Sequence, residues 1–182
     1  MHFYRSILHH KQFRYLGAFY IHSIIMLFSV AIFQIFNGIY IYQIFVDTGF
    51  KMHQALAFCS LIFSLMYLVQ ALSVPVALWL IAKKGLRFSV FWGNGCLILF
   101  YIFLFLAKFD PIFLILASIL GGLNLGLYWT AHHAYFVELT DDKKQGEEIS
   151  INNALAAVVA IGAPAFGGLV IAYFGYEILF LI

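Results

Sequence analysis

Charged side chains are scarce in this chain of 182 residues: only 10% are Asp, Glu, Lys or Arg, whereas 64% are hydrophobic. Soluble domains carry about 25% charged residues and roughly 45–50% apolar ones. A water-soluble fold could not bury so much apolar surface, because roughly 30% of the unfolded chain's area stays exposed in a folded domain of about 150 residues. The composition therefore argues against a soluble enzyme, a disordered chain and a disulfide-stapled secreted domain. It predicts that the surrounding solvent is lipid.

Residues that support chemistry are also few. Cys59 and Cys96 lie in apolar runs, and neither belongs to a CxxC pair, so we expect two buried thiols and no metal site. No HExxH, P-loop, GxGxxG or Ser/His/Asp pattern is present. The net charge of +2 is too small to indicate a nucleic-acid partner. We therefore expect no catalytic residues and no cofactor.

The charged residues divide the chain into long apolar runs. A membrane-spanning helix needs about 20 such residues, whereas the strands of a membrane β-barrel need only about ten. Five complete charge-free runs cover residues 15–46, 52–82, 88–107, 111–137 and 149–176, and a sixth begins at Ile178. The sequence thus predicts an all-α integral membrane protein with five complete transmembrane helices and the start of a sixth. We expect it to be a fragment truncated in that sixth helix.

Basic residues predict the orientation in the membrane, because cytoplasmic loops carry an excess of Lys and Arg. If the predicted spans alternate in direction, eight of the ten basic residues fall on one side: Arg5, Lys11, Arg14, Lys83, Lys84, Arg87, Lys143 and Lys144. Only Lys51 and Lys108 fall on the other. We expect residues 1–14 to form a cytoplasmic segment, followed by a multi-pass bundle over residues 15–182 in a cell or inner membrane.

Two short patterns are similar to those of a known family. At the end of the second run, residues 78–87 are similar to a ten-residue signature, and its second half is Ala82-Lys83-Lys84-Gly85-Leu86-Arg87. The signature reads glycine, three residues, aspartate, a basic residue, any residue, glycine, any residue and a basic residue. Lys83, Gly85 and Arg87 match, whereas Leu78 and Ala82 replace the first glycine and the aspartate. In the fifth run, Ala163-Pro164-Ala165-Phe166-Gly167-Gly168 is similar to a Gly-Pro-x-x-Gly-Gly motif. With the spacing of the runs, these patterns resemble the N-terminal half of a major facilitator superfamily transporter.

The resemblance implies a six-helix bundle within a secondary active transporter that moves a small solute by alternating access. It implies a gating loop formed by Lys83, Gly85 and Arg87, and a hinge in the fifth helix at Pro164, Gly167 and Gly168. The expected partners are the lipid bilayer, the solute and a missing C-terminal half of the same protein.

Neutral polar residues form stripes on three of the predicted helices. Ser23, Gln34 and Asn37 lie within about 60° of one another at about 100° per residue. Asn124, Tyr128, His132 and Tyr135 lie within about 80° on the fourth helix. Ser60, Ser64 and Tyr67 share a face of the second helix. Polar groups inside a membrane usually face a cavity or bond a neighbouring helix, and both possibilities stay open for each residue.

In the resembled family, the first and fourth helices line the central cavity. The candidates for the substrate path are therefore Gln34, Asn37, Tyr67, Asn124, Tyr128 and His132. His132 and His133 point about 100° apart, so at most one of them can lie on the polar face. Ser29 lies off its stripe, and we expect it to bond its own helix backbone. Because no Lys or Arg lies within these stripes, a neutral or weakly cationic solute is favoured.

Two other hypotheses remain open at this point. A half-size scaffold, working as a dimeric subunit, would have the same composition. A membrane redox protein could bind haem between two histidines on different helices, such as His22 and His132.

Overall fold

The computed structural model of the chain describes residues 2–140 and 145–179, and every regular element in these two ranges is an α-helix. The helices are α1 (His2–Asp47), α2 (Met52–Lys84), α3 (Leu86–Leu106), α4 (Phe113–Leu139), α5 (Gln145–Phe174) and α6 (Tyr176–Leu179). Residues 141–144, which lie between the predicted fourth and fifth runs and include Lys143 and Lys144, are outside the described residues. So are Met1 and residues 180–182, the end of the predicted sixth run.

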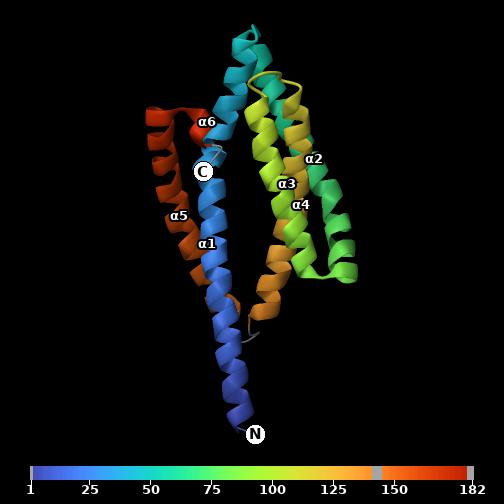
Figure 1. Cartoon of the computed structure of the whole chain (residues 1–182), viewed down its shortest axis with the longest axis vertical. Helices are drawn as coiled ribbons and strands as arrows, with labels where there is room; N and C mark the ends of the chain where they lie inside the picture. Colours follow the sequence, from blue (N-terminus) through green and yellow to red (C-terminus); the bar gives the residue numbers. More distant parts are fainter. Residues whose placement is uncertain (1, 141–144, 180–182) are drawn as a thin grey trace.

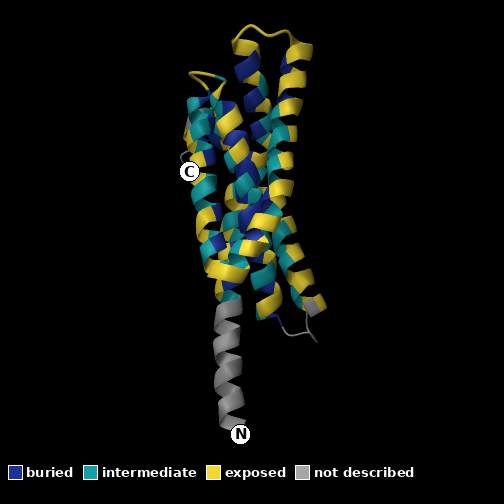
Figure 2. Ribbon diagram, turned by 90° about the vertical axis from the view of Figure 1, so that its right-hand side faces the viewer, coloured by how far each residue is buried: buried dark blue, intermediate teal, exposed yellow. Residues whose placement is uncertain are grey.

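Within the two described ranges, five helices are long and apolar enough to cross a bilayer, as the charge-free runs predicted. These segments are Gly17–Asp47, Met52–Lys84, Leu86–Leu106, Phe113–Leu139 and Gly146–Phe174. Large apolar side chains stand exposed along their outer faces, Leu61, Leu99 and Ile161 among them, and Figure 2 shows exposed positions along the length of the bundle. Such a surface suits hydrocarbon rather than water, so the chain is a multi-pass integral membrane protein.

Short connections join the spans into antiparallel neighbours. Between α2 and α3, the chain reverses at Gly85, whose φ of 87° lies in the left-handed region that glycine adopts with little cost. Gly85 N–H also donates to the carbonyl of Ile81 at 2.9 Å, which closes the last turn of α2. Because this reversal takes a single residue, α3 already begins at Leu86.

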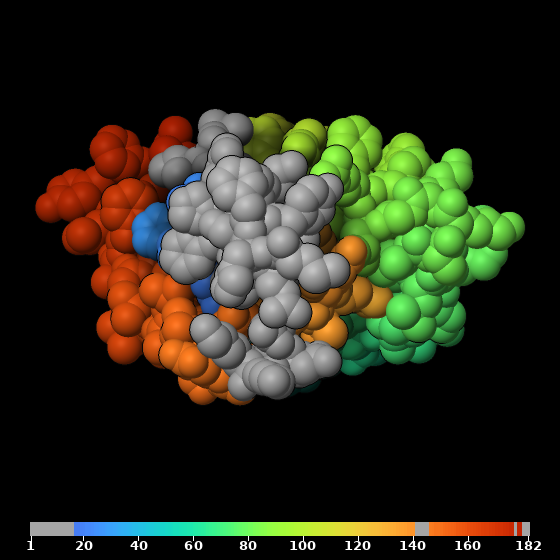
Figure 3. Space-filling model, turned by 90° about the horizontal axis from the view of Figure 1, so that it is seen from below, coloured from blue at the N-terminus to red at the C-terminus, as the bar shows by residue number. Residues whose placement is uncertain are grey.

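The five spans form two groups, α1 with α5 and α2 with α3 and α4, and α1 contacts both α2 and α4 of the second group. Helix α4 packs against both α2 and α3, whereas α5 packs against α1. In Figure 1, α2, α3 and α4 lie side by side, and α5 lies beyond α1. Seen from the N-terminal end, α5 occupies the opposite side of the molecule from α2 and α3 (Figure 3). Helix α1 touches α4 less extensively than it touches α5.

Glycines allow the helices within each group to approach closely. A Cβ on Gly93 of α3 would lie 2.8 Å from the backbone nitrogen of Tyr128 on α4. A Cβ on Gly122 of α4 would meet the Met66 carbonyl and lie 2.7 Å from the Val69 Cβ, both on α2. The contact of α1 with α5 is equally close at Gly167. Small residues commonly bring helix backbones together in membranes.

Candidate functional site

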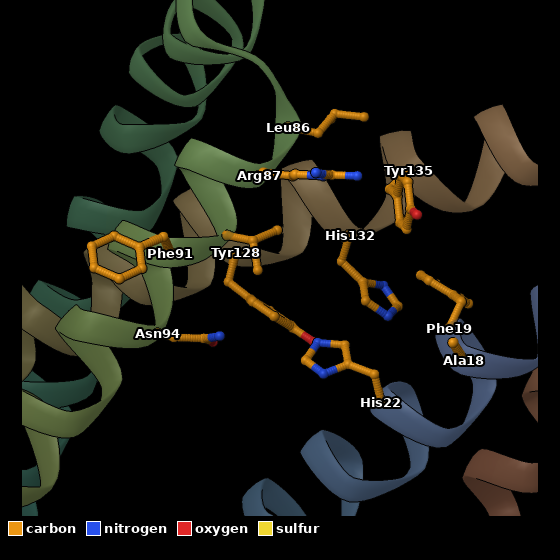
Figure 4. A pocket seen from close by; sticks show the side chains of 11 residues that line it. Ala18, Phe19, His22, Leu86, Arg87, Phe91, Asn94, Tyr128, His132 and Tyr135 are labelled. Atoms are coloured by element: carbon orange, nitrogen blue, oxygen red, sulfur yellow. The ribbon is translucent and has the colours of Figure 1, made fainter. Parts of the chain in front are cut away.

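A cavity of about 430 Å³ lies between α1, α3 and α4 (Figure 4). Its walls are largely apolar, with Phe19 from α1 and Phe91 from α3 among them. Its polar lining consists of His22, Arg87, Asn94, Tyr128, His132 and Tyr135. Ligand sites in proteins are typically concave, mostly apolar and about 300–1,000 Å³ in volume, with a few converging polar groups. This cavity has those properties.

His132 is the more enclosed of the two histidines that line the cavity. It is only 6% exposed, and its Nε2 lies 2.9 Å from the Ser23 hydroxyl oxygen. The imidazole also packs against the Phe19 ring, with 4.6 Å between the ring centroids. Its Nδ1 is buried without a hydrogen-bond partner. His132 therefore links α4 to α1 through one ring nitrogen and keeps the other unused.

A second polar pair joins the same two helices. The Tyr128 hydroxyl lies 3.1 Å from Nε2 of His22, and Tyr128 is fully buried. His22 and Ser23 are neighbours on α1, and Tyr128 lies one turn before His132 on α4. The two hydrogen bonds therefore cross the α1–α4 interface at one level and form one wall of the cavity.

Helix α3 supplies the opposite wall and the mouth. Arg87 is exposed, lies in the first turn of α3, and extends over the cavity toward Tyr135 (Figure 4). Asn94 lies seven residues later, on the same face of α3, and its Oδ1 is buried without a partner. None of the described residues that line the cavity is Asp or Glu.

The predicted path residues do not all meet at this cavity. Tyr128 and His132 line it together. Asn37 is buried beside a much smaller gap of about 10 Å³, and its Oδ1 has no partner. Asn124 donates from Nδ2 to the Gly93 carbonyl at 2.9 Å and thereby ties α4 to α3. Gln34 and Tyr67 are exposed on the outside of α1 and α2.

Two finer expectations are confirmed. The Ser29 hydroxyl donates to the Ile25 carbonyl of its own helix at 3.0 Å. His132 is buried, whereas its neighbour His133 is exposed, so one histidine of the pair lies on the polar face. The haem hypothesis gains no support from the geometry, because His22 Nε2 and His132 Nε2 already bond Tyr128 and Ser23.

The residues of the predicted gating loop have different surroundings. Lys83 Nζ lies 4.5 Å from the centre of the Trp79 ring, and Gly85 forms the reversal between α2 and α3. Arg87 lines the cavity instead of lying in a loop. Sequence reasoning missed Arg87, Phe91 and Asn94 as cavity residues, although their spacing of four and three places them on one helix face.

The predicted hinge lies where α5 meets α1. Pro164 is inside α5, and the first residue of its motif, Ala163, is fully buried. A Cβ on Gly167 would lie 2.6 Å from the Ile32 carbonyl oxygen, whereas one on Gly168 would make an ordinary contact of 3.6 Å with Phe36. Gly167 is therefore the closest point of the α1–α5 contact among these residues.

Comparisons with known proteins agree with this architecture. A family model described as the Major Facilitator Superfamily matches residues 23–182. Searches of curated proteins and of solved structures gave no significant match. The family match takes in all five apolar spans almost entirely, and the chain therefore belongs to the Major Facilitator Superfamily, a family of membrane transporters.

Proposed function

We propose that this chain forms the N-terminal bundle of a secondary active transporter that moves a small solute by alternating access. The observation that carries the proposal is the cavity between α1, α3 and α4, which is lined by the His22–Tyr128 and Ser23–His132 pairs. Polar side chains within a membrane are costly and commonly mark a solute path. Here they converge from different helices on one hollow.

The two pairs suit a path that opens and closes. Interhelical hydrogen bonds between side chains in a membrane contribute only about 0.6 kcal/mol on average. A solute that offers its own polar groups could replace such bonds at little cost. Among the described residues, these pairs are the main polar link between α1 and α4. Replacing their hydrogen bonds by bonds to a solute would therefore loosen the α1–α4 interface and leave the other interfaces packed.

Exposed polar side chains on the outer faces of α1 and α2 favour the presence of a second helical bundle that packs against them. Gln34 and Tyr67 are exposed, and a glutamine facing hydrocarbon would leave its amide without partners. We propose that a C-terminal half covers this face and that Gln34 and Tyr67 then border the path between the halves. In that arrangement Pro164, Gly167 and Gly168 form the pliable part of α5.

A sixth spanning helix fits a groove that is already present. An apolar hollow of about 550 Å³ runs between α1 and α3, and Leu179 of α6 lies at its edge. We propose that a sixth spanning helix occupies this groove and seals the cavity from lipid. The end of the bundle with the α2–α3 turn would then face the cytoplasm, as the excess of Lys and Arg predicts.

A transport assay with a matched pair of histidine variants tests the function. In proteoliposomes that contain the complete transporter, we expect uptake of at least one solute from a panel of neutral, cationic and anionic compounds. His132→Ala should impair that uptake far more than folding, and Asn37→Ala should do the same to a smaller extent. His133→Ala is the control, because His133 is adjacent but exposed.

Equal uptake by the His132→Ala and His133→Ala variants would remove His132 from the path. No uptake of any panel solute above empty liposomes, by protein that folds normally, would overturn the transport proposal itself.

A further inference from the structure

The polar groups around the cavity are not balanced in charge. Arg87 carries a positive charge at the mouth, and two histidines also line the cavity, the exposed His22 and the buried His132. None of the described residues that line the cavity carries a carboxylate. A group of hydrogen-bond donors and cations without a counter-anion is suited to an anionic ligand. A neutral or weakly cationic solute was favoured because Arg87 was expected to lie in a loop, away from the solute path. In the structure Arg87 lines the cavity.

The N-terminus of α3 also favours an anionic ligand. Leu86 and Arg87, the first residues of α3, both line the mouth. The first N–H groups of a helix have no partner within the helix and carry a partial positive charge. The N-cap residue Gly85 has no side chain that could bond them. An anion at the mouth would therefore meet the Arg87 guanidinium and the positive end of α3 together.

The buried interior supplies an independent observation. His132 is 94% buried, because only 6% of it is exposed, and its Nδ1 has no hydrogen-bond partner. When the Ser23 hydroxyl donates to Nε2, the proton of the neutral ring lies on Nδ1. In that tautomer Nδ1 is an unpaired buried donor, which is costly, and a ligand that accepts from Nδ1 would be stabilised there.

The remaining walls limit what else the ligand can be. Phe19, Val90 and Phe91 are among the apolar residues that line the cavity, whose surface is mainly apolar. A small inorganic anion would leave these surfaces without contacts, whereas an apolar or aromatic body would cover them. The cavity of about 430 Å³ lies near the lower end of the usual range for small-molecule sites.

We propose that this cavity binds an amphipathic organic monoanion: a carboxylate that pairs with Arg87, on an apolar or aromatic body that lies against Phe19, Val90 and Phe91. This inference names the solute class for the path proposed above and rests on that proposed function. Arg87 would hold the carboxylate in a two-pronged hydrogen bond, which its planar guanidinium suits better than a lysine does.

Equilibrium dialysis of radiolabelled probes against the purified protein in nanodiscs tests the proposal, with empty nanodiscs to correct for partitioning into lipid. Benzoate represents a soluble monocarboxylate, decanoate a lipid-derived one, and benzamide is the neutral match of benzoate. We expect benzoate or decanoate to bind at least about tenfold more tightly than benzamide, because a charge-assisted hydrogen bond replaces a neutral one. Whichever carboxylate binds more tightly identifies the source of the ligand.

Arg87→Gln should weaken carboxylate binding about tenfold or more and leave benzamide binding unchanged. Lys84→Gln is the matched control, because Lys84 lies three residues earlier at the end of α2 but faces the Phe88 ring, with its Nζ 4.9 Å from the ring centroid. Benzamide binding as tight as benzoate and decanoate in the unmodified protein, or equal losses in the two variants, would overturn the proposal. This binding assay does not depend on transport. If the protein takes up a neutral solute but binds neither carboxylate, the proposed solute class is refuted, whereas the proposed transport function is not.

Discussion

Helix α4 packs backbone to backbone against α2 and α3, whereas it meets α1 through hydrogen-bonded side chains. On the first side, Gly93 and Gly122 leave no room for even a methyl group. On the second side, Ser23 and His22 reach His132 and Tyr128 beside a cavity of about 430 Å³. Close-packed interfaces transmit motion as rigid units, so the interface with side-chain bridges is the one that can open.

The largest effect should come from filling the close-packed side. Gly122→Ala places a Cβ against the Met66 carbonyl, which belongs to the backbone and cannot rotate away. We expect the free energy of unfolding to fall by about 1–3 kcal/mol, the usual cost of overpacking, in an SDS titration from mixed micelles. Gly95→Ala is the control, because nothing lies within 4 Å of its Cβ position. Equal stability of the two variants would show that α2 and α4 are not in close contact.

A somewhat smaller effect is expected where α5 meets α1. A Cβ on Gly167 would lie 2.6 Å from the Ile32 carbonyl oxygen, but α5 packs mainly against α1 and can shift outward. We expect Gly167→Ala to cost about 1–2 kcal/mol in the same titration. Gly162→Ala, with open space at its Cβ, should not destabilise the protein. A loss as large as that of Gly122→Ala would place the α1–α5 contact among the rigid ones.

The smallest effect on stability should come from the side of the cavity. Tyr128→Phe removes the hydroxyl that lies 3.1 Å from His22 Nε2 and keeps the ring. We expect a loss of about 0.6 kcal/mol, the average for such a bond in a membrane. Tyr173→Phe is the control, since Tyr173 is exposed on α5. If Tyr128→Phe instead cost several kcal/mol, the α1–α4 contact would be as rigid as the glycine interfaces.

The number of spans and the short turns between them could be predicted because charge in hydrocarbon is costly. The hydrogen bond of Ser29 to its own helix could also be predicted, because Ser29 lies off the polar stripe and its hydroxyl has the helix backbone within reach. The positions of the spans around the bundle axis could not be predicted in this way. Gln34 and Asn37 share a stripe on α1, yet Gln34 is exposed and Asn37 is buried. Which residues of a polar stripe are buried depends on the neighbouring helix that covers them, and the sequence of one helix does not contain that information.

Arg87 illustrates a second limit. Dividing the chain at its charges placed Arg87 in a loop, whereas the reversal at Gly85 needs only one residue and puts Arg87 in the first turn of α3. Its spacing to Asn94 then brings both residues to the cavity. Charge identifies where a span ends, but turn chemistry decides on which side of that end a residue lies.

Cysteine labelling of two positions on α3 tests most directly whether the α1–α4 side contains an aqueous hollow. In a protein whose Cys59 and Cys96 are replaced by Ala, Asn94→Cys would lie in the cavity. Ser89→Cys would lie nearer the helix end but packed against α4, where the Ser89 hydroxyl now donates to the Leu127 carbonyl at 2.9 Å. We predict that a water-soluble maleimide modifies Asn94→Cys rapidly and leaves Ser89→Cys unmodified. An unreactive Asn94→Cys, or equal reactivity at the two positions, would contradict this account.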